Sequence, residues 1–369
     1  MRIASFNVEN MFSRARALND DWAVNEDMLN DYNRLTIILQ KSVYSAADKQ
    51  EIVGLLQTLG LSRSDESLFV TLRRNRGTLL KRSTSAPPVV VANGRDDWVG
   101  WLELKKEAVD EVATRMTAKV IQDVGADVLA VVEAEDRIAL KRFNEQLLEA
   151  LNVPYHSIML IDGNDERGID VGLMTKPGYV IESLVSHVDD LDSNQKLLFS
   201  RDCPEFTIRV ASGLTVLVLV NHFKSKGFGS QKANDAKRRA QAQRVREIYD
   251  LRRSQGHDKI AIVGDLNDTP DREPLKPLLG NGSDLRDIFD NPHFDGDERP
   301  GTFGNGNKGD KIDYILLSPE LFARMTNGGI ERRGVWGGKN GTLFPHYAEM
   351  TKDIHAASDH AAIWADLNV

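Results

Sequence analysis

Short apolar runs that each end in a carboxylate, an amide or a histidine recur along the chain, and this pattern restricts the fold more than any other feature. The clearest runs are VLAVVE, which ends at Glu133, LTVLVLVNH, which ends at His222, and AIVGDLN, which ends at Asn267. Helix-like segments separate some of these runs, while other runs follow one another directly. This order predicts an α/β protein with some antiparallel strand pairing.

The polar ends of these runs suit a single site. Parallel strands present their carboxyl ends at one edge of a sheet. Asp313 and the pair Asp359 and His360 precede their runs, so they reach the same edge only if those strands run in the opposite direction. In a mixed sheet, one cleft would then hold Asn7, Glu9, Glu133, His222, Asp265, Asn267, Asp313, Asp359 and His360.

These residue types suggest metal-assisted phosphate chemistry. Oxygen ligands suit a hard divalent cation such as Mg²⁺ or Mn²⁺, which binds through carboxylates and substrate phosphate. An Asp such as Asp265 would accept a proton from the attacking water, and Asn267 would help to aim that water. A protonated histidine would neutralise charge that develops on phosphorus. Any one of these residues alone is more often structural, because polar residues gather at strand ends anyway, but their joint occurrence favours a site.

The composition excludes several classes of protein. The 369 residues carry a formal net charge of -8, which argues against a wholly basic surface but not against a local basic groove. The single cysteine, Cys203, excludes an internal disulfide and a thiolate metal site. The chain shows no signal peptide and no run of about 18 apolar residues. We therefore expect a cytoplasmic protein that does not enter a membrane.

Residues 12–101 interrupt the strand-like pattern. Helix formers with apolar residues three and four apart predict a largely helical insertion after the first strand. The insertion carries the basic run RRNRGTLLKR, and Trp98 and Trp101 are either stacking surfaces for bases or buried side chains at a junction. A long helix is expected over 102–124, ended by Gly125.

Several motifs, taken in chain order, carry a resemblance to a known family. They are ASFNVEN, DVLAVVEAED, RGIDVGLMT, VNHFKSKG, VGDLNDTP, DKIDYILLS and ASDHAAI. The series resembles the endonuclease/exonuclease/phosphatase superfamily, which includes pancreatic-type deoxyribonucleases and apurinic endonucleases, over residues 1–10 and 103–369. The resemblance implies a four-layer α/β/β/α sandwich of two mixed sheets covered by helices. We expect a single domain over 1–369, with 12–101 inserted.

The resemblance also implies single-step, metal-assisted hydrolysis of a phosphoester. Glu133 matches the main metal ligand, and Asn7 and Glu9 match residues near the metal. Asp265 resembles the general base, and Asn267 resembles the residue that orients the nucleophile or the phosphate. The implied cofactor is Mg²⁺ or Mn²⁺. Some members have aspartate at the position of Glu9, which leaves its direct contact with the metal open.

Two histidines complete the implied site. His360 resembles the phosphate-binding histidine, oriented by Asp313, while Asp359 is expected to reach the metal. His222 matches the second histidine of the deoxyribonuclease and sphingomyelinase branches. Apurinic endonucleases place a tyrosine in the segment that here reads RGIDVGLMT, and this chain has none. We expect Asp170 to orient His222 instead.

The residues around His222 bear on the substrate. Asn221, Lys224 and Arg167 are assigned to substrate binding, although a plain surface position is an equal alternative for Arg167. The helix-like segment NDAKRRAQAQRVREIYDLRRS is basic, and a basic face beside the cleft suits a polyanion. A solvated charged face is the usual alternative. We expect a nuclease that acts on DNA, with RNA as the second choice; the sequence identifies no protein partner.

Other functions stay open at this point. A phosphatase or phosphodiesterase acting on a small nucleotide or a phospholipid head group is compatible with the same fold, because a fold does not name a substrate. A catalytically silent binding module is also conceivable. Such a module would be expected to have lost acid, base or metal residues, and every motif position here carries a chemically competent residue.

Overall fold

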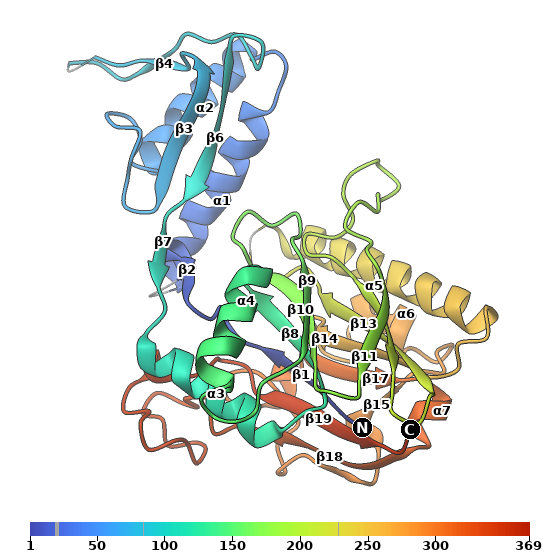
Figure 1. The fold of residues 1–369 in the computed structure, drawn as a ribbon. Coiled ribbons are helices and arrows are strands. Elements are labelled where there is room, and N and C mark those ends of the chain that lie inside the picture. The colour runs from blue at the N-terminus through green and yellow to red at the C-terminus, as the bar shows by residue number, and fades with distance from the viewer. Residues whose placement is uncertain (19–21, 84, 228) are drawn as a thin grey trace. The chain divides into compact units, whose positions relative to one another are not determined.

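The chain folds into two compact units (Figure 1). The computed structural model describes residues 1–18, 22–83, 85–227 and 229–369. The main unit comprises Met1–Phe12, Val109–Lys226 and Ser230–Val369. The inserted unit comprises Ser13–Ala108.

The first large sheet of the main unit has the strand order β16-β18-β19-β1-β8-β10-β9. Its strands are β16 (Phe294–Asp295), β18 (Met325–Glu331), β19 (Ala362–Leu367), β1 (Arg2–Asn7), β8 (Val128–Ala134), β10 (Asp170–Thr175) and β9 (Ser157–Ile161). At its centre β1 runs parallel to β8 and antiparallel to β19. The sheet is therefore mixed, which brings the carboxyl end of β1 to the same edge as the start of β19.

The second large sheet has the order β11-β12-β13-β14-β17-β15. Its strands are β11 (Val180–Val185), β12 (Glu205–Arg209), β13 (Thr215–His222), β14 (Ile260–Asp265), β17 (Asp313–Leu317) and β15 (Arg286–Asp287). Here β13 and β14 are parallel, and β17 is antiparallel to β14. This sheet is mixed in the same way as the first.

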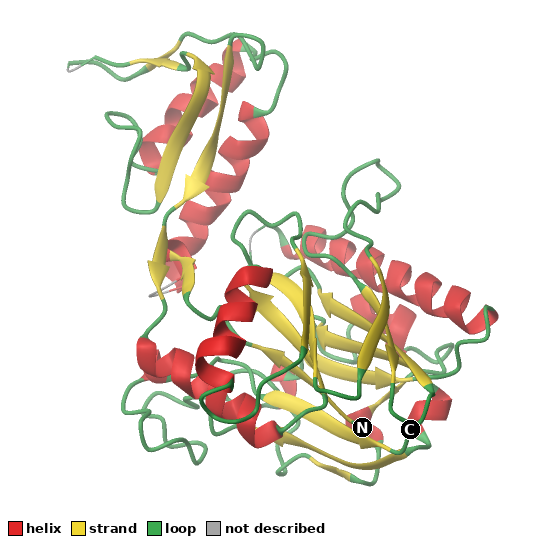
Figure 2. Ribbon diagram, viewed as in Figure 1, coloured by secondary structure: helices red, strands yellow, loops and turns green. Residues whose placement is uncertain are grey.

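Helices cover the outer faces of the two sheets (Figure 2). They are α3 (Glu111–Val124), α4 (Arg137–Phe143), α5 (Gln231–Ser254), α6 (Lys276–Leu279) and α7 (Pro319–Phe322), with short helical turns η2 (Asn144–Leu148), η3 (Glu273–Leu275), η4 (Ile288–Asp290), η5 (Lys308–Asp310) and η6 (Asp353–His355). The expected four-layer α/β/β/α sandwich is confirmed.

Alternate residues of β8 divide between two hydrophobic layers. Val128, Ala130 and Val132 lie in the core between the sheets, whereas Leu129 and Val131 belong to the core beneath the helices. Successive side chains of a strand point to opposite faces. Because both faces of β8 are buried, its sequence reads as a continuous apolar run.

The helix expected over 102–124 is shorter in the structure. Asp110 caps α3 by accepting a hydrogen bond from the N–H of Val112, and the helix ends at Gly125, whose φ is 61°. The residues before Asp110 form strands instead. Gly125 was predicted correctly as the stop, since glycine adopts this left-handed conformation without strain.

The inserted unit is mixed rather than largely helical. Its helical segments are α1 (Trp22–Leu39), α2 (Ala46–Thr58) and the turn η1 (Arg16–Leu18), and its strands are β2 (Ser13–Ala15), β3 (Val70–Gly77), β4 (Leu80–Lys81), β5 (Val89–Val90), β6 (Trp98–Leu104) and β7 (Lys106–Ala108). The strands pair as β2-β7, β3-β6 and β4-β5. Buried and exposed residues alternate along β6. This period of two is typical of a half-buried strand, and the end of β6 overlaps the start of the helix expected over 102–124.

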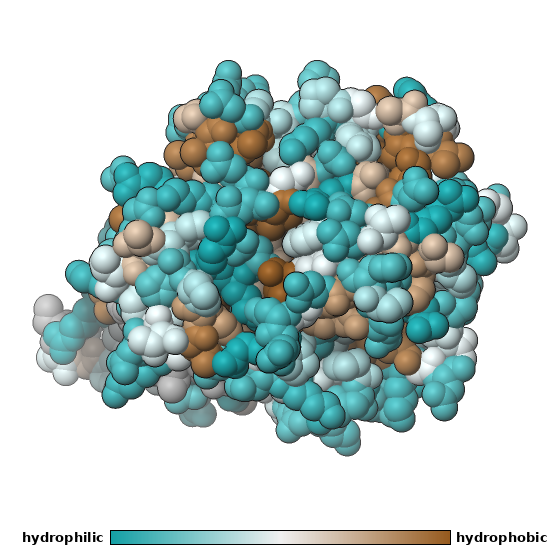
Figure 3. All heavy atoms as spheres, turned by 90° about the horizontal axis from the view of Figure 1, so that it is seen from below, coloured by the Kyte–Doolittle hydropathy of each residue, from teal (hydrophilic) through white to brown (hydrophobic). Residues whose placement is uncertain are grey.

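The surface carries mostly hydrophilic side chains on the face drawn in Figure 3, with hydrophobic groups scattered between them. Among the described residues, no helix has both the length and the apolar character that crossing a bilayer requires. The cytoplasmic location stays a prediction.

Candidate active site

Strand register places three of the expected residues next to one another. His222 on β13 faces Asp265 on β14, and Asp265 faces Asp313 on β17. Because β17 runs antiparallel to β14, the first residue of β17 lies beside the last residue of β14. We expected Asp313 to reach the site only if its strand ran in the opposite direction, and β17 does so.

Five side chains form two groups that share Asp265. The groups are Glu133, His222 and Asp265, and Asp265, Asp313 and His360, and within each group one ligand atom per residue lies within 4.8 Å of the others. Asn7, from the other sheet, joins them, because its Nδ2 lies 3.4 Å from Asp265 Oδ2 and 3.4 Å from His360 Nε2. Residues from both sheets thus converge on one place.

Unusual backbone conformations occur at the expected site residues. Among the residues that the structure describes, eight non-glycine residues have positive φ, and they include Glu9 (48°), Glu133 (64°) and Asn267 (54°). Glu133 is the extra residue of a bulge where β8 pairs with β10. Such conformations cost about 1–3 kcal/mol each and are typical of functional sites. A bulge also re-aims a side chain that strict alternation would send elsewhere.

Asp265 is buried, and amide groups hold its carboxylate. Oδ1 accepts a hydrogen bond from the backbone N–H of Asn267 at 2.8 Å, and Oδ2 accepts one from the Asn267 side chain at 3.0 Å. At Gly264, where φ is 126°, a Cβ would lie 1.9 Å from the carbonyl oxygen of Asn221, so β13 and β14 approach closely only with glycine. Burial, and then the proximity of Asp313, raises the pKa of Asp265 to about 8.

His360 and Asp313 form the pair expected from the sequence. His360 Nδ1 donates to Asp313 Oδ2 at 2.9 Å, and Thr302 Oγ1 donates to the same oxygen at 2.6 Å. Burial disfavours a charged imidazole, but Asp313 and then Asp359 outweigh burial and hold the pKa of His360 well above its usual value. His360 is therefore protonated at neutral pH, with Nε2 4.0 Å from Asp265 Oδ2. No motif in the sequence marked Thr302.

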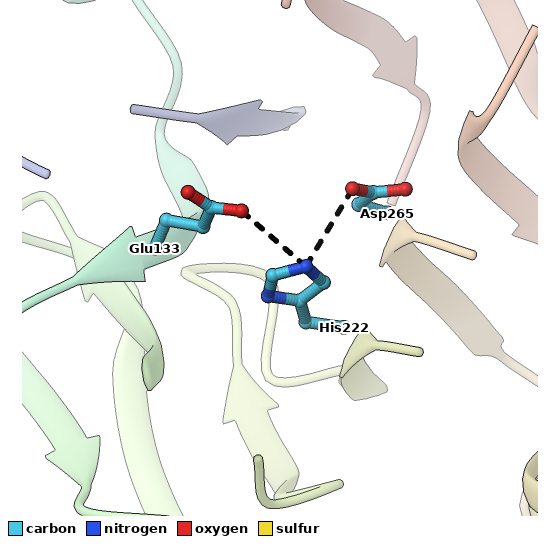
Figure 4. Close-up of side chains that lie close together, drawn as sticks. All are labelled: Glu133, His222 and Asp265. Carbon is cyan, nitrogen blue, oxygen red and sulfur yellow. Dashed lines mark ion pairs between the residues drawn. The ribbon is translucent and has the colours of Figure 1, made fainter. Parts of the chain in front are cut away.

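The pKa of His222 is shifted in the opposite direction from that of His360. Its Nε2 lies 3.4 Å from Glu133 Oε1 and 3.7 Å from Asp265 Oδ2 (Figure 4). Burial, and then the charges of Arg201 and Arg167, hold the pKa of His222 well below its usual value. The ring is therefore neutral, and the two carboxylates near Nε2 favour the tautomer with its proton on that atom.

The hydrogen bond expected between Asp170 and His222 is not formed. Asp170 Oδ1 accepts from the backbone N–H of Gly163 at 2.8 Å, while His222 Nδ1 is buried and has no hydrogen-bond partner within the described ranges. Asp170 opens β10 of the first sheet and turns toward the loop that precedes it. Burial raises the pKa of Asp170 to about 7.

A buried arginine cluster lies close to the site. Arg167 Nε donates to Asp165 Oδ1 at 2.8 Å, and Arg201 Nη1 lies 3.3 Å from Asp165 Oδ2. Arg201 also donates to the carbonyl oxygen of Phe223 at 2.8 Å and is 1% exposed. Glu133 interacts electrostatically with both guanidinium groups and favours their charged form. The sequence interpretation included Arg167 but missed Asp165 and Arg201.

The other residues assigned to substrate binding differ in their access. Burial, and then Arg167, lowers the pKa of Lys224 to about 7, and its Nζ lies 3.2 Å from the carbonyl oxygen of Ser225. Asn221 is 1% exposed and donates to Leu219 of its own strand at 3.2 Å. Lys224 lies at the rim of the arginine cluster, whereas Asn221 is packed within the sheet.

Glu9 and Asp359 border the site from the first sheet and the loop before β19. Asn7 Oδ1 accepts from the N–H of Glu9 at 3.1 Å, and Glu9 Oε2 accepts from the N–H of Asp359 at 3.3 Å. The carboxylate of Asp359 is 47% exposed and lies 3.6 Å from His360 Nε2. These contacts tie both acids to the group around Asp265.

Helix α5 does not present the basic face that the sequence suggested. Its cationic side chains are engaged within the protein, in the pairs Arg238–Asp268, Arg239–Glu273, Arg244–Asp190 and Arg246–Asp284 and in the hydrogen bond from Lys237 to the carbonyl oxygen of Leu197. Arg238 is 1% exposed. Asp235, Glu247 and Asp250 of the same helix add further pairs, while Asp190, Asp268, Glu273 and Asp284 come from other elements, which the sequence of the helix alone could not show.

The donor set suits a hard divalent cation. Glu133 and Asp265 offer carboxylate oxygens within one group, and the carboxylate of Asp359 lies 3.6 Å from His360 of the other group. Glu133 is 20% exposed, so solvent and ions have access to it. Oxygen donors of this kind are the ligands that Mg²⁺ and Mn²⁺ prefer. The residues therefore fit the cofactor predicted from the sequence.

Comparison with known proteins identifies the family of this chain and structures that share its fold. The sequence model of the Endonuclease/Exonuclease/phosphatase family matches residues 90–326. The structure resembles an endonuclease/exonuclease/phosphatase from Bacteroides vulgatus, with a TM-score of 0.50 and 16% identity over 70% of this chain and 91% of that one. It also resembles a mannosyl-6-phosphatase from Bacteroides thetaiotaomicron, with a TM-score of 0.51 and 16% identity over 70% of this chain and 92% of that one. No curated protein matches the sequence.

Proposed function

Since this chain belongs to the endonuclease/exonuclease/phosphatase family and is therefore a phosphoester hydrolase, we propose that it is a divalent-metal-dependent phosphodiesterase that cleaves nucleic acid, with DNA favoured over RNA. The observation that carries the proposal is the pair of residue groups that share Asp265. They place a carboxylate between a protonated and a neutral imidazole.

In the proposed reaction, Asp265 accepts a proton from the water that attacks phosphorus. Asn267 donates hydrogen bonds to the Asp265 carboxylate from both its backbone and its side chain. These two bonds hold the carboxylate in one orientation, which fixes the direction from which the water attacks phosphorus. Because burial raises the pKa of this carboxyl to about 8, it is mostly protonated at neutral pH in the absence of a cation. A divalent cation held by these residues would supply positive charge that neutralises the phosphate and favours the ionised form of this carboxyl.

The two histidines take different parts in the proposal. His360, protonated and fixed by Asp313 and Thr302, donates a hydrogen bond from Nε2 to a phosphate oxygen whose charge grows in the transition state. His222, neutral, donates from Nε2 without adding charge. Asp170 forms no hydrogen bond with His222, so we assign it no direct part in the reaction.

Metal and phosphate binding are assigned to different sides of the site. We assign Glu133 as the main ligand of Mg²⁺ or Mn²⁺, with Asn7, Glu9 and Asp359 bordering the same position. The positive charge opposite them comes from three residues: Arg167, Arg201 and Lys224. Asn221 is buried on β13 opposite Gly264 of β14, and its part in substrate binding stays a prediction.

A substrate panel tests the proposal. Purified full-length protein is incubated with labelled single- and double-stranded DNA, RNA, bis(para-nitrophenyl) phosphate and para-nitrophenyl phosphate, in Mg²⁺, in Mn²⁺ and in EDTA. We expect cleavage of the polymers and of the diester, and none in EDTA. Cleavage of the monoester alone, or turnover in EDTA, would contradict the proposal.

A phosphatase acting on a small phosphate ester is the second candidate. Two observations favour it: the cations of α5 are neutralised within the protein, and a mannosyl-6-phosphatase has the same fold. A rate on small monoesters that greatly exceeds the rate on polymers would establish this alternative.

A further inference from the structure

The strand pair β3–β6 of the inserted unit has one face in the hydrophobic core. Val70 and Leu72 on β3 and Leu102 and Leu104 on β6 pack in one cluster with residues of α1 and α2. Trp98 is 1% exposed and belongs to the same cluster. Of the two tryptophans that the sequence left open, Trp98 is therefore a core residue and has no surface for a ligand.

The opposite face displays an aromatic ring among arginines. Trp101 is 48% exposed, and strand register places it directly opposite Arg73, while Arg76 faces Val99. Because residues of β6 alternate between faces, Val99 and Trp101 lie on the same side, away from the helices. We call Arg73, Arg76, Val99 and Trp101 the ribbon face.

The charge of this segment differs from that of the whole protein. Residues 70–82 contain five Lys or Arg and no Asp or Glu, in a chain whose net charge is -8. Arg73 pairs with Glu103, but both side chains are about half exposed, and such pairs contribute little. Arg76 donates to the carbonyl oxygen of Asp96, which leaves its charge unneutralised. Arg82 pairs with Asp65, whereas Arg74, Arg76 and Lys81 are exposed and make no ion pair among the described residues.

We propose that the ribbon face binds single-stranded nucleic acid. An exposed indole on a strand offers a plane on which an unpaired base stacks, and arginines beside it meet the flanking phosphates. Bases of a duplex are stacked on one another and do not offer their faces to Trp101. An acidic peptide would satisfy the arginines but not the ring. The inference extends the proposed function, because it gives a polymer substrate a second place to bind.

Binding is measured apart from cleavage. Full-length protein in EDTA is titrated against fluorescein-labelled single-stranded DNA, single-stranded RNA and duplex DNA, and fluorescence anisotropy gives Kd. We expect Trp101→Ala to weaken single-strand binding by about 5-fold or more, whereas Trp101→Phe keeps most of the affinity. Removing Arg73 and Arg76 together should also lower the salt dependence of binding.

The control is Leu68→Ala, which removes another exposed apolar side chain of the same unit, 55% exposed, from outside the ribbon face. It should bind as the wild type does. Thermal unfolding checks that each variant is folded. Wild-type affinity in Trp101→Ala, or an equal loss in Leu68→Ala, overturns the inference.

The proposed nuclease activity and the proposed binding at the ribbon face can be refuted independently of each other. Loss of single-strand binding in Trp101→Ala together with no cleavage of any polymer would support the ribbon face and refute the nuclease. Metal-dependent cleavage of polymers together with unchanged binding in Trp101→Ala would support the nuclease and refute the ribbon face.

Discussion

The candidate active site of the main unit has buried charged side chains, whereas those of the ribbon face on the inserted unit are exposed. In the active site, Asp265, Asp313 and His360 are buried, and each is fixed by named neighbours. On the ribbon face, Arg73 and Arg76 are exposed and make few contacts. Leaving a buried charge without its partner strongly lowers the free energy of unfolding, whereas removing an exposed charge changes it little. Substitutions in the two regions should therefore have different effects.

The charged side chains of helix α5 are intermediate between these two regions in burial. Its sequence is as basic as that of β3, yet the less exposed pairs of Arg238 with Asp268 and of Arg244 with Asp190 neutralise part of that charge. A run of basic residues therefore does not identify a binding surface. What matters is whether the fold supplies acids opposite it.

The largest effect is expected from removing the proposed base or the protonated histidine. Asp265→Asn and His360→Ala should each lower kcat for a phosphodiester by about 1000-fold, because general acid–base groups contribute about 10²–10⁴-fold. Initial rates with Mg²⁺ or Mn²⁺ measure this. Trp101→Ala should keep the wild-type rate on bis(para-nitrophenyl) phosphate, and a comparable loss there would break the distinction between the two regions.

Removal of a buried charge should have the next largest effect. Arg201→Met leaves the carbonyl oxygen of Phe223 without its donor and removes one of the two guanidinium groups on Asp165. We expect it to lower the free energy of unfolding by about 3 kcal/mol, as breaking a buried pair does. Urea unfolding measures the change. Arg73→Ala, at an exposed pair, should leave the urea midpoint unchanged, and equal losses would refute the comparison.

A smaller and pH-dependent effect is expected at His187, a buried pair outside the active site. Its Nδ1 lies 3.0 Å from Asp190 Oδ2, and its Nε2 lies 3.0 Å from Glu205 Oε1. Burial opposes the charge, but Glu205 and then Asp190 raise the pKa of His187. Its stabilisation is therefore full below the unfolded pKa of about 6.5 and is lost as pH rises through the raised folded pKa.

Comparison of His187→Gln with wild type by urea unfolding tests this. The variant should lose about 1 kcal/mol at pH 6 and less at pH 9. A loss that does not change with pH, or that grows toward pH 9, would show that the imidazolium is not what stabilises the pair.

The smallest effect compares the two basic segments directly. Arg76 on β3 is exposed and makes no ion pair among the described residues, whereas Arg244 on α5 pairs with Asp190. Arg76→Ala should weaken binding of single-stranded DNA and reduce the salt slope by about 1, and Arg244→Ala should change neither. Anisotropy titrations at several salt concentrations measure both. The reverse result would move the nucleic-acid surface to α5.

The sequence predicted the parts of the fold and the site that depend on local pattern. The central strands β8, β13 and β14 appear in the sequence as apolar runs, and their polar ends locate residues such as Glu133 and Asp265 at the sheet edge. Residues that reach the site from loops were missed, as Thr302 and Arg201 show, because no periodicity leads to them. The strands of the inserted unit were missed for a related reason: β3 carries three arginines, and its pairing with β6 spans a long loop.

The site residues themselves remain predictions about chemistry, although the structure brings most of them together. Glu133, His222 and Asp265 lie within one group, whereas Asn221 is packed inside its sheet. Pairing between Asp170 and His222 could not be judged from sequence, because it depends on which way a bulge turns the first residue of β10. Such turns follow from tertiary packing.

A metal titration of Glu133→Gln against wild type tests the central claim most directly. Initial rates of phosphodiester hydrolysis are followed as Mg²⁺ or Mn²⁺ is added to metal-free protein. We predict no turnover in EDTA for either protein and a metal concentration for half-maximal rate that is at least about 10-fold higher in the variant, as the loss of a carboxylate ligand requires. Turnover of the wild type in EDTA, or identical metal dependence in both proteins, would contradict a metal centre built on Glu133.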